Sequence, residues 1–108
     1  MSIVTANVTT AGNVVYTSSG NTAITFLSIC NYGNTNASFN FHVVPAGNTV
    51  GNNNLVFGNV VLQSGNTNSG DTFQIYNAAE KILLANGDFI QISSNANTIT
   101  AVTSYTTI

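Results

Sequence analysis

The amino-acid sequence predicts an all-β fold built as an antiparallel β-sandwich, and three observations lead to this prediction. The common residues Asn, Thr, Ser, Gly and Val are all poorer helix formers than Ala or Leu. Short runs rich in Val, Ile, Phe, Tyr and Thr are separated by Gly and Asn, which is typical of strands and turns. Within these runs apolar and polar residues alternate, so each strand is expected to bury one face.

The runs predict about seven to nine short strands. In chain order they lie at residues 3–10, 13–16, 23–32, 38–44, 55–62, 71–76, 81–84, 88–93 and 98–106. Gly-Asn pairs recur between them at irregular intervals, so turns in a sandwich explain these pairs better than a solenoid of stacked repeats.

Turn residues divide the strands. Asn86-Gly87 predicts a two-residue hairpin, because both central positions of such a turn must tolerate positive φ. Pro45-Ala46-Gly47 closes the strand before it, and residues 48–54 and 64–70 are expected to be amide-rich loops. A single helical turn is plausible at residues 77–80, with Asn77 as its N-cap.

The alternation assigns side chains to faces. Phe39, Phe41 and Val43 share one side of their strand, and Asn40 and His42 point to the other. The other expected apolar sets are Leu55, Phe57 and Val61 (with an irregularity at Gly58 and Asn59), Phe73 with Ile75, Ile90 with Ile92, and Ile99 with Ala101 and Tyr105. Such patterns fit two packed sheets, so we expect residues 1–108 to form one immunoglobulin-like or jelly-roll-like domain.

Only four residues carry a full charge, namely Asp71, Glu80, Lys81 and Asp88. A single cation argues against nucleic acid, whose phosphates require several Lys or Arg, and against a polybasic membrane anchor. No apolar run is long enough for a membrane span, and the N-terminus lacks the pattern of a secretory signal. The neutral surface instead suits a protein that is packed among other proteins.

No catalytic, cofactor-binding or metal-binding residue is predicted. His42 and Cys30 are the only residues of their types, so neither a triad nor a His/Cys zinc site can be assembled. A thiolate–imidazole pair between them would need a third orienting group, and Cys30 is expected to be a buried thiol in its apolar run. Asp71 and Asp88 each follow a glycine at a strand start, where a carboxylate ordinarily binds turn amides.

Carbohydrate binding is the main chemical alternative. The chain is rich in Asn but has no Trp, and its tyrosines are Tyr16, Tyr32, Tyr76 and Tyr105. These tyrosines lie in or beside predicted strands, which favours packing within the sandwich with the hydroxyl at its rim. A sugar site would require them to line the Asn-rich loops instead.

Several segments resemble a family of small virion proteins of tailed bacteriophages, in particular structural proteins of marine and cyanobacterial phages. The shared segments are residues 16–31 (YTSSGNTAITFLSICN), 37–47 (ASFNFHVVPAG), 70–76 (GDTFQIY), 80–90 (EKILLANGDFI) and the Thr-rich last strand that ends at Ile108. The resemblance covers nearly the whole chain and rests on strand and turn residues. It implies a β-sandwich domain that is built into a particle.

The resemblance and the neutral surface together predict a non-enzymatic structural protein of the virion, made in the host cytoplasm. Its leading expected role is to decorate or cement the capsid, docked on a larger protein scaffold and on copies of itself as a homo-oligomer. A neck, tail or baseplate accessory is the alternative within that class. A glycan-binding or receptor-binding module is the alternative outside it.

Overall fold

A computed structural model describes residues 2–33, 35–63, 72–75 and 82–108, and it confirms the all-β prediction. The described residues form strands β1 (Ser2–Val8), β2 (Asn13–Thr17), β3 (Thr22–Asn31), β4 (Ala37–Val44), β5 (Leu55–Leu62), β6 (Thr72–Ile75), β7 (Ile82–Leu84), β8 (Phe89–Ser94) and β9 (Ile99–Thr107). Each predicted strand corresponds to one of these, with ends that differ by at most two residues. One 3-10 turn, η1 (Asn52–Asn54), lies in a segment expected to be an irregular loop.

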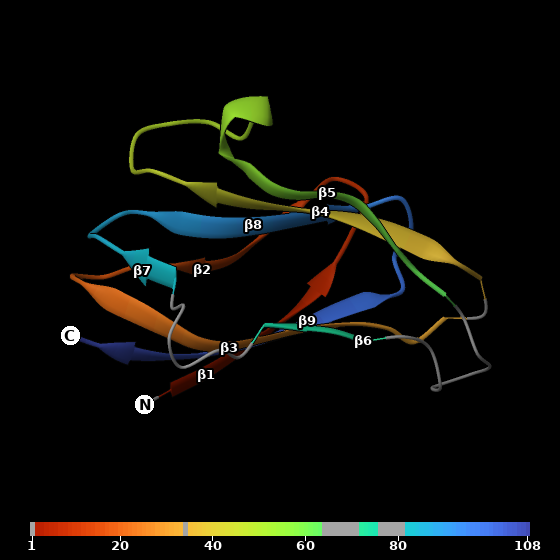
Figure 1. Cartoon of the computed structure of the whole chain (residues 1–108), viewed down its shortest axis with the longest axis horizontal. Coiled ribbons are helices and arrows are strands. Elements are labelled where there is room, and N and C mark those ends of the chain that lie inside the picture. The colour runs from red at the N-terminus through yellow and green to blue at the C-terminus, as the bar shows by residue number, and fades with distance from the viewer. Residues whose placement is uncertain (1, 34, 64–71, 76–81) are drawn as a thin grey trace.

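The strands form two antiparallel sheets that pack face to face (Figure 1). Sheet A has the order β1-β9-β3, and both β6 and β7 pair with the far side of β3; sheet B has the order β2-β8-β4-β5. The chain changes sheet at every connection except β4–β5 and β6–β7. If β6 and β7 are taken as one interrupted strand, this alternation is the arrangement of a jelly roll.

The hydrophobic core lies between the two sheets, where the inward sides of the strands meet. Its fully buried large side chains are Val8, Leu27, Ile29, Phe39, Phe41, Ile90, Ile92 and Ile99. The predicted faces of β4, β8 and β9 are therefore confirmed. Tyr16 and Tyr105 close the core at its edge, with ring centroids 4.2 Å apart.

The predicted face of β5 is wrong on both sides of Phe57. Before it, a register shift pairs Leu55 with the outward-facing His42, and Leu55 is exposed rather than in the core. Phe57 pairs with Phe41, but Val60 pairs with Phe39, so β5 holds one more residue than β4 in this interval. The extra residue lies at the expected irregularity, where Asn59 has a φ of 53°. Because one added residue turns every later side chain over, Val60 rather than Val61 packs against the core.

The Asn86-Gly87 turn is present, but it is not the predicted hairpin. It joins β7 in sheet A to β8 in sheet B, so the two strands do not pair with each other. Gly87 has a φ of +88°, whereas the φ of Asn86 is not positive. The main-chain N–H of Asp88 donates to the carbonyl oxygen of Ala85 (3.1 Å), and these features together define a type II turn. Such a turn does not follow the twist of a two-stranded ribbon, which suits a connection between layers.

A buried amide, Asn31, ties together three parts of the fold. Its Nδ2 donates to the carbonyl oxygens of Thr35 (2.9 Å) and Leu62 (3.0 Å). Its Oδ1 accepts from the main-chain N–H of Gly33 and from the Thr98 hydroxyl, each at 3.0 Å. The side chain thus satisfies its full hydrogen-bonding capacity and holds the end of β5 to β3.

Candidate functional site

His42 and Val44 lie on the outer side of sheet B, away from the core. They alternate along β4 with Phe41 and Val43, which pack into the core, and this confirms the predicted direction of His42. Both side chains are nevertheless buried, His42 being only 7% exposed. The loop of residues 45–54 lies above this side of the sheet (Figure 1), and its η1 turn contacts β4. We infer that this loop covers both side chains.

The His42 side chain is largely removed from solvent. Its Nδ1 atom is buried and has no hydrogen-bond partner among the described residues. Burial lowers the pKa of His42 below its usual value of 6.5, because desolvation penalises the charged imidazolium. His42 is therefore neutral at physiological pH, as part of a covered strand rather than as an exposed sheet residue.

Cys30 is not the buried thiol that the sequence predicts. On β3 the inward positions are Leu27, Ile29 and Asn31, all fully buried, whereas Cys30 lies between them on the outer side and is partly exposed. The apolar run misled the prediction because alternation, rather than overall hydropathy, decides the side. Since Cys30 belongs to sheet A and His42 to sheet B, each on its outer side, the sandwich separates the two residues.

The carboxylate of Asp88 has the structural role expected for it. Oδ1 accepts from the main-chain N–H of Ala46 and Oδ2 from that of Ala85, both at 2.9 Å. It thereby joins the loop after β4 to the turn before β8. The other charged residues, Asp71, Glu80 and Lys81, lie outside the described residues, as do the loop at 64–70, the predicted turn at 77–80 and Tyr76.

The described tyrosines are engaged within the fold. Tyr16 stacks on Tyr105, and its hydroxyl lies 3.2 Å from that of Thr22. The Tyr32 hydroxyl lies 3.0 Å from Oδ1 of Asn7 and 3.2 Å from the carbonyl oxygen of Asn97. This confirms the packing role expected for Tyr16 and Tyr105, while Tyr32 remains about one-third exposed at the rim.

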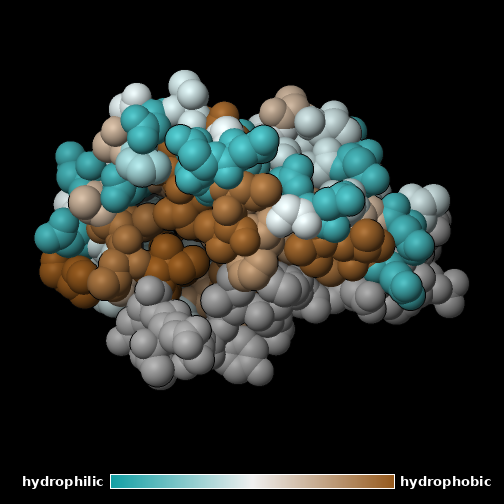
Figure 2. Space-filling view, turned by 45° about the horizontal axis from the view of Figure 1, so that its top comes forward, coloured by the Kyte–Doolittle hydropathy of each residue, from teal (hydrophilic) through white to brown (hydrophobic). Residues whose placement is uncertain are grey.

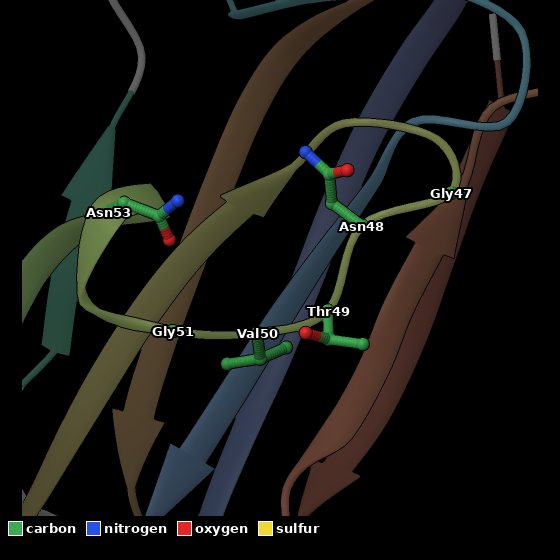
Figure 3. A pocket seen from close by; sticks show the side chains of 6 residues that line it. All are labelled: Gly47, Asn48, Thr49, Val50, Gly51 and Asn53. Carbon is green, nitrogen blue, oxygen red and sulfur yellow. The ribbon is translucent and has the colours of Figure 1, made fainter.

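The Asn-rich loop at 45–54 encloses a shallow, open hollow of about 370 Å³. Figure 3 shows the amide groups of Asn48 and Asn53 on the inner side of the loop, whereas the Val50 side chain points away from it. The loop holds its own shape, since Asn54 donates to the carbonyl oxygen of Thr49 and accepts from the N–H of Gly51. The hollow is polar, and none of the described tyrosines lines it.

Apolar side chains are exposed beside this loop. Figure 2 shows them as a band beneath the polar residues of the loop. On β5 the exposed aliphatic residues are Leu55, Val56 and Val61, and on β7, which belongs to the other sheet, Leu83 is 65% exposed. Exposed aliphatic side chains among neutral polar residues are suited to contact with another protein.

Within the described ranges, no group of three or more His, Cys, Asp and Glu side chains could hold a metal ion. Over the same residues, none of the helical structure is long and apolar enough to cross a membrane. Comparisons with models of protein families, with curated proteins and with solved structures find no match to this chain.

Proposed function

We propose that this chain is a non-enzymatic structural component of a tailed-phage particle that decorates or cements the capsid. In this role it docks on a larger protein scaffold and on copies of itself. The observation that carries the proposal is the apolar surface beside the 45–54 loop, together with the exposed aliphatic side chains Leu55, Val56 and Val61 of β5 and Leu83 of β7. The resemblance of the sequence to phage virion proteins is the reason for proposing a phage particle as the assembly in which the chain docks.

Covering such a surface with a protein partner favours association for two reasons. Burying aliphatic side chains is favourable in proportion to the area removed from water, about 25 cal/mol per Å². Neutral amides can then form hydrogen bonds across the interface without the large desolvation cost of burying charges. The jelly-roll order of the strands occurs in capsid domains and also in lectins, so it supports the proposal only as an analogy of fold.

A neck, tail or baseplate position would use the same surface in the same way. Glycan binding is a second candidate, favoured by the hollow at 47–53, into which the amides of Asn48 and Asn53 point. None of the described residues that line that hollow is aromatic, so they offer no ring on which a sugar could stack. The docking role is therefore the better supported of the two.

The test is a density map of particles purified from the host in which the chain is made, together with mass spectrometry of their proteins. We expect many copies of the chain, with the surface beside the 45–54 loop covered by a protein neighbour. Absence of the chain from the purified particles would refute the proposal. Retention of a sugar on a glycan array, lost in Asn48→Ala and Asn53→Ala variants, would establish the glycan alternative.

A further inference from the structure

Strand β1 forms one open edge of sheet A and is regular over its whole length. All seven of its residues, Ser2 to Val8, pair with β9 from Tyr105 to Ile99 without a register shift. Among the described residues, no further main-chain hydrogen bond reaches the other side of β1. An edge of this kind presents a row of main-chain N–H and C=O groups that can pair with another strand.

β1 also lacks the features that usually prevent such pairing. Its sequence, SIVTANV, contains no charged residue, no proline and no glycine, and the strand has no bulge. The other long edges are interrupted: β5 shifts register twice against β4, and β2 shifts once against β8. β1 is therefore the edge best suited to accept a strand.

The outward side chains of β1 are accessible. Ser2, Ile3, Thr5 and Asn7 are exposed, and Ile3 reaches 68%. β1 lies with β2 on the side of the sandwich opposite β5, β6 and β7 (Figure 1), and hence away from the apolar surface beside the 45–54 loop. A partner on β1 would leave that surface free.

The geometry points to β1 of a second copy as the partner, paired antiparallel about a two-fold axis. Residues opposite each other in an antiparallel pair lie on the same side of the sheet. The register that pairs all seven residues therefore has its axis at Thr5, the central residue, so Thr5 faces Thr5 of the second copy. Val4 then faces Ala6, and both are inward-facing and packed against the core.

In this register every residue of β1 has a partner in the second copy, and inward-facing residues lie opposite inward-facing ones. No like charges oppose each other. It places exposed Ile3 opposite Asn7 of the second copy, whose side chain already accepts from Tyr32. The central Thr–Thr pair is a favourable cross-strand contact. Two copies of sheet A thereby become one continuous sheet, and the contact is isologous, as is typical of soluble dimers.

The test compares the mass in solution of the wild-type chain with that of two matched variants. Thr5→Lys places two like charges at the axis, whereas Val61→Lys adds the same charge to an exposed position of the β5 edge. Light scattering is expected to give a dimer, twice 11.2 kDa, for the wild type and for Val61→Lys, and a monomer for Thr5→Lys. A monomeric wild type at submillimolar concentration, or a dimer lost only in Val61→Lys, would overturn the inference.

A second measurement covers the case in which Thr5→Lys fails to fold. In a Cys30→Ser background, Thr5→Cys should be joined to its copy by a short bis-maleimide, and Val61→Cys should not. Crosslinking at position 61 alone would contradict the assignment to β1. If the β1 amides were protected from hydrogen exchange only in particles, the assignment would also be contradicted, because a scaffold strand would then be the partner of β1.

The inference deepens the proposed self-association and so rests on it, but the two can fail separately. A monomeric chain that is still found in purified particles would refute the β1 dimer and leave the structural role standing. A Thr5-dependent dimer that is missing from particles would support the dimer and refute the structural role.

Discussion

The two edge strands β1 and β5 resemble each other in composition and differ in geometry. Both are neutral and both carry exposed aliphatic residues, but β1 pairs without interruption, whereas β5 is bulged at Val56 and again at Gly58 and Asn59. The Asn40 side chain fixes the second bulge by accepting from the N–H of Asn59 at 2.6 Å. Natural sheets often protect an edge with lysine. In this chain, which has one lysine, bulges take that role on β5.

The largest expected effect comes from removing the aromatic anchor of β5. Phe41 is fully buried and its ring centroid lies 5.9 Å from that of Phe57 on β5. Phe41→Ala should lower the free energy of unfolding by about 3–5 kcal/mol, because it leaves a cavity. Val8→Ala, at the buried end of β1, should lower the free energy of unfolding by only about 1.5 kcal/mol, because it removes two methyl groups from the core. Urea denaturation checks both, and equal losses would contradict this difference in anchoring.

A smaller effect is expected at Asn31, which binds the last carbonyl group of β5. Asn31→Ala should cost about 2–4 kcal/mol, since each buried group left without a partner costs about 1–3 kcal/mol. Thermal unfolding measures the loss. Exposed Asn21→Ala is the control and should stay within about 0.5 kcal/mol of the wild type. If both variants were equally stable, the role given to the Asn31 hydrogen bonds would be wrong.

The bulge itself can be strained by one substitution. Asn59 has a φ of 53°, a conformation that Asn tolerates and that a β-branched residue adopts only at a cost. Asn59→Val should lower the free energy of unfolding by about 1–2 kcal/mol, whereas Asn59→Gly should be nearly neutral. Thr5→Val on regular β1 is the matched control and should not destabilise the fold. Denaturant titration of the three variants decides the point.

The smallest expected effect is a dependence of stability on pH near β5. Because burial depresses the pKa of His42 below 6.5, the unfolded chain binds the proton more tightly than the folded one. Stability should therefore be fully present above about pH 6.5 and decrease as the pH falls toward the lower folded pKa. His42→Gln should flatten this part of the profile of melting temperature against pH. Hydrogen exchange should rise in β5, which pairs with His42 at Leu55, more than in β1.

The strands and most of their faces could be predicted from the sequence, because period-two alternation is a local property. Phe39, Phe41, Ile90 and Ile92 are all buried as their spacing indicates. Local patterns also located the irregularity at Asn59. They could not show that it turns Val61 outward, because that depends on how β5 pairs with β4.

The features that were not predicted depend on contacts between distant segments. Asn86-Gly87 has the composition of a hairpin turn, but the pairing of β7 with β3 and of β8 with β2 and β4 makes it a link between sheets. His42 is buried on the outer side of sheet B, so it must be covered from outside its own strand, which the alternation of β4 cannot reveal. Asn31 stands at an inward position of an apolar run, and a polar residue at such a position is the one local signal that could have identified its role.

The pairing of β1 with β9 has a consequence for how the chain folds. These are the first and the last strands, so sheet A cannot gain its β1 edge until β9 has left the ribosome. The sheet-changing connections also make most strand pairings distant in sequence, and folding of such all-β topologies takes milliseconds to seconds. During this delay strands without charged residues, such as β1, stay unpaired and are prone to aggregate. The pairing of β1 with β9 therefore forms late, in competition with aggregation.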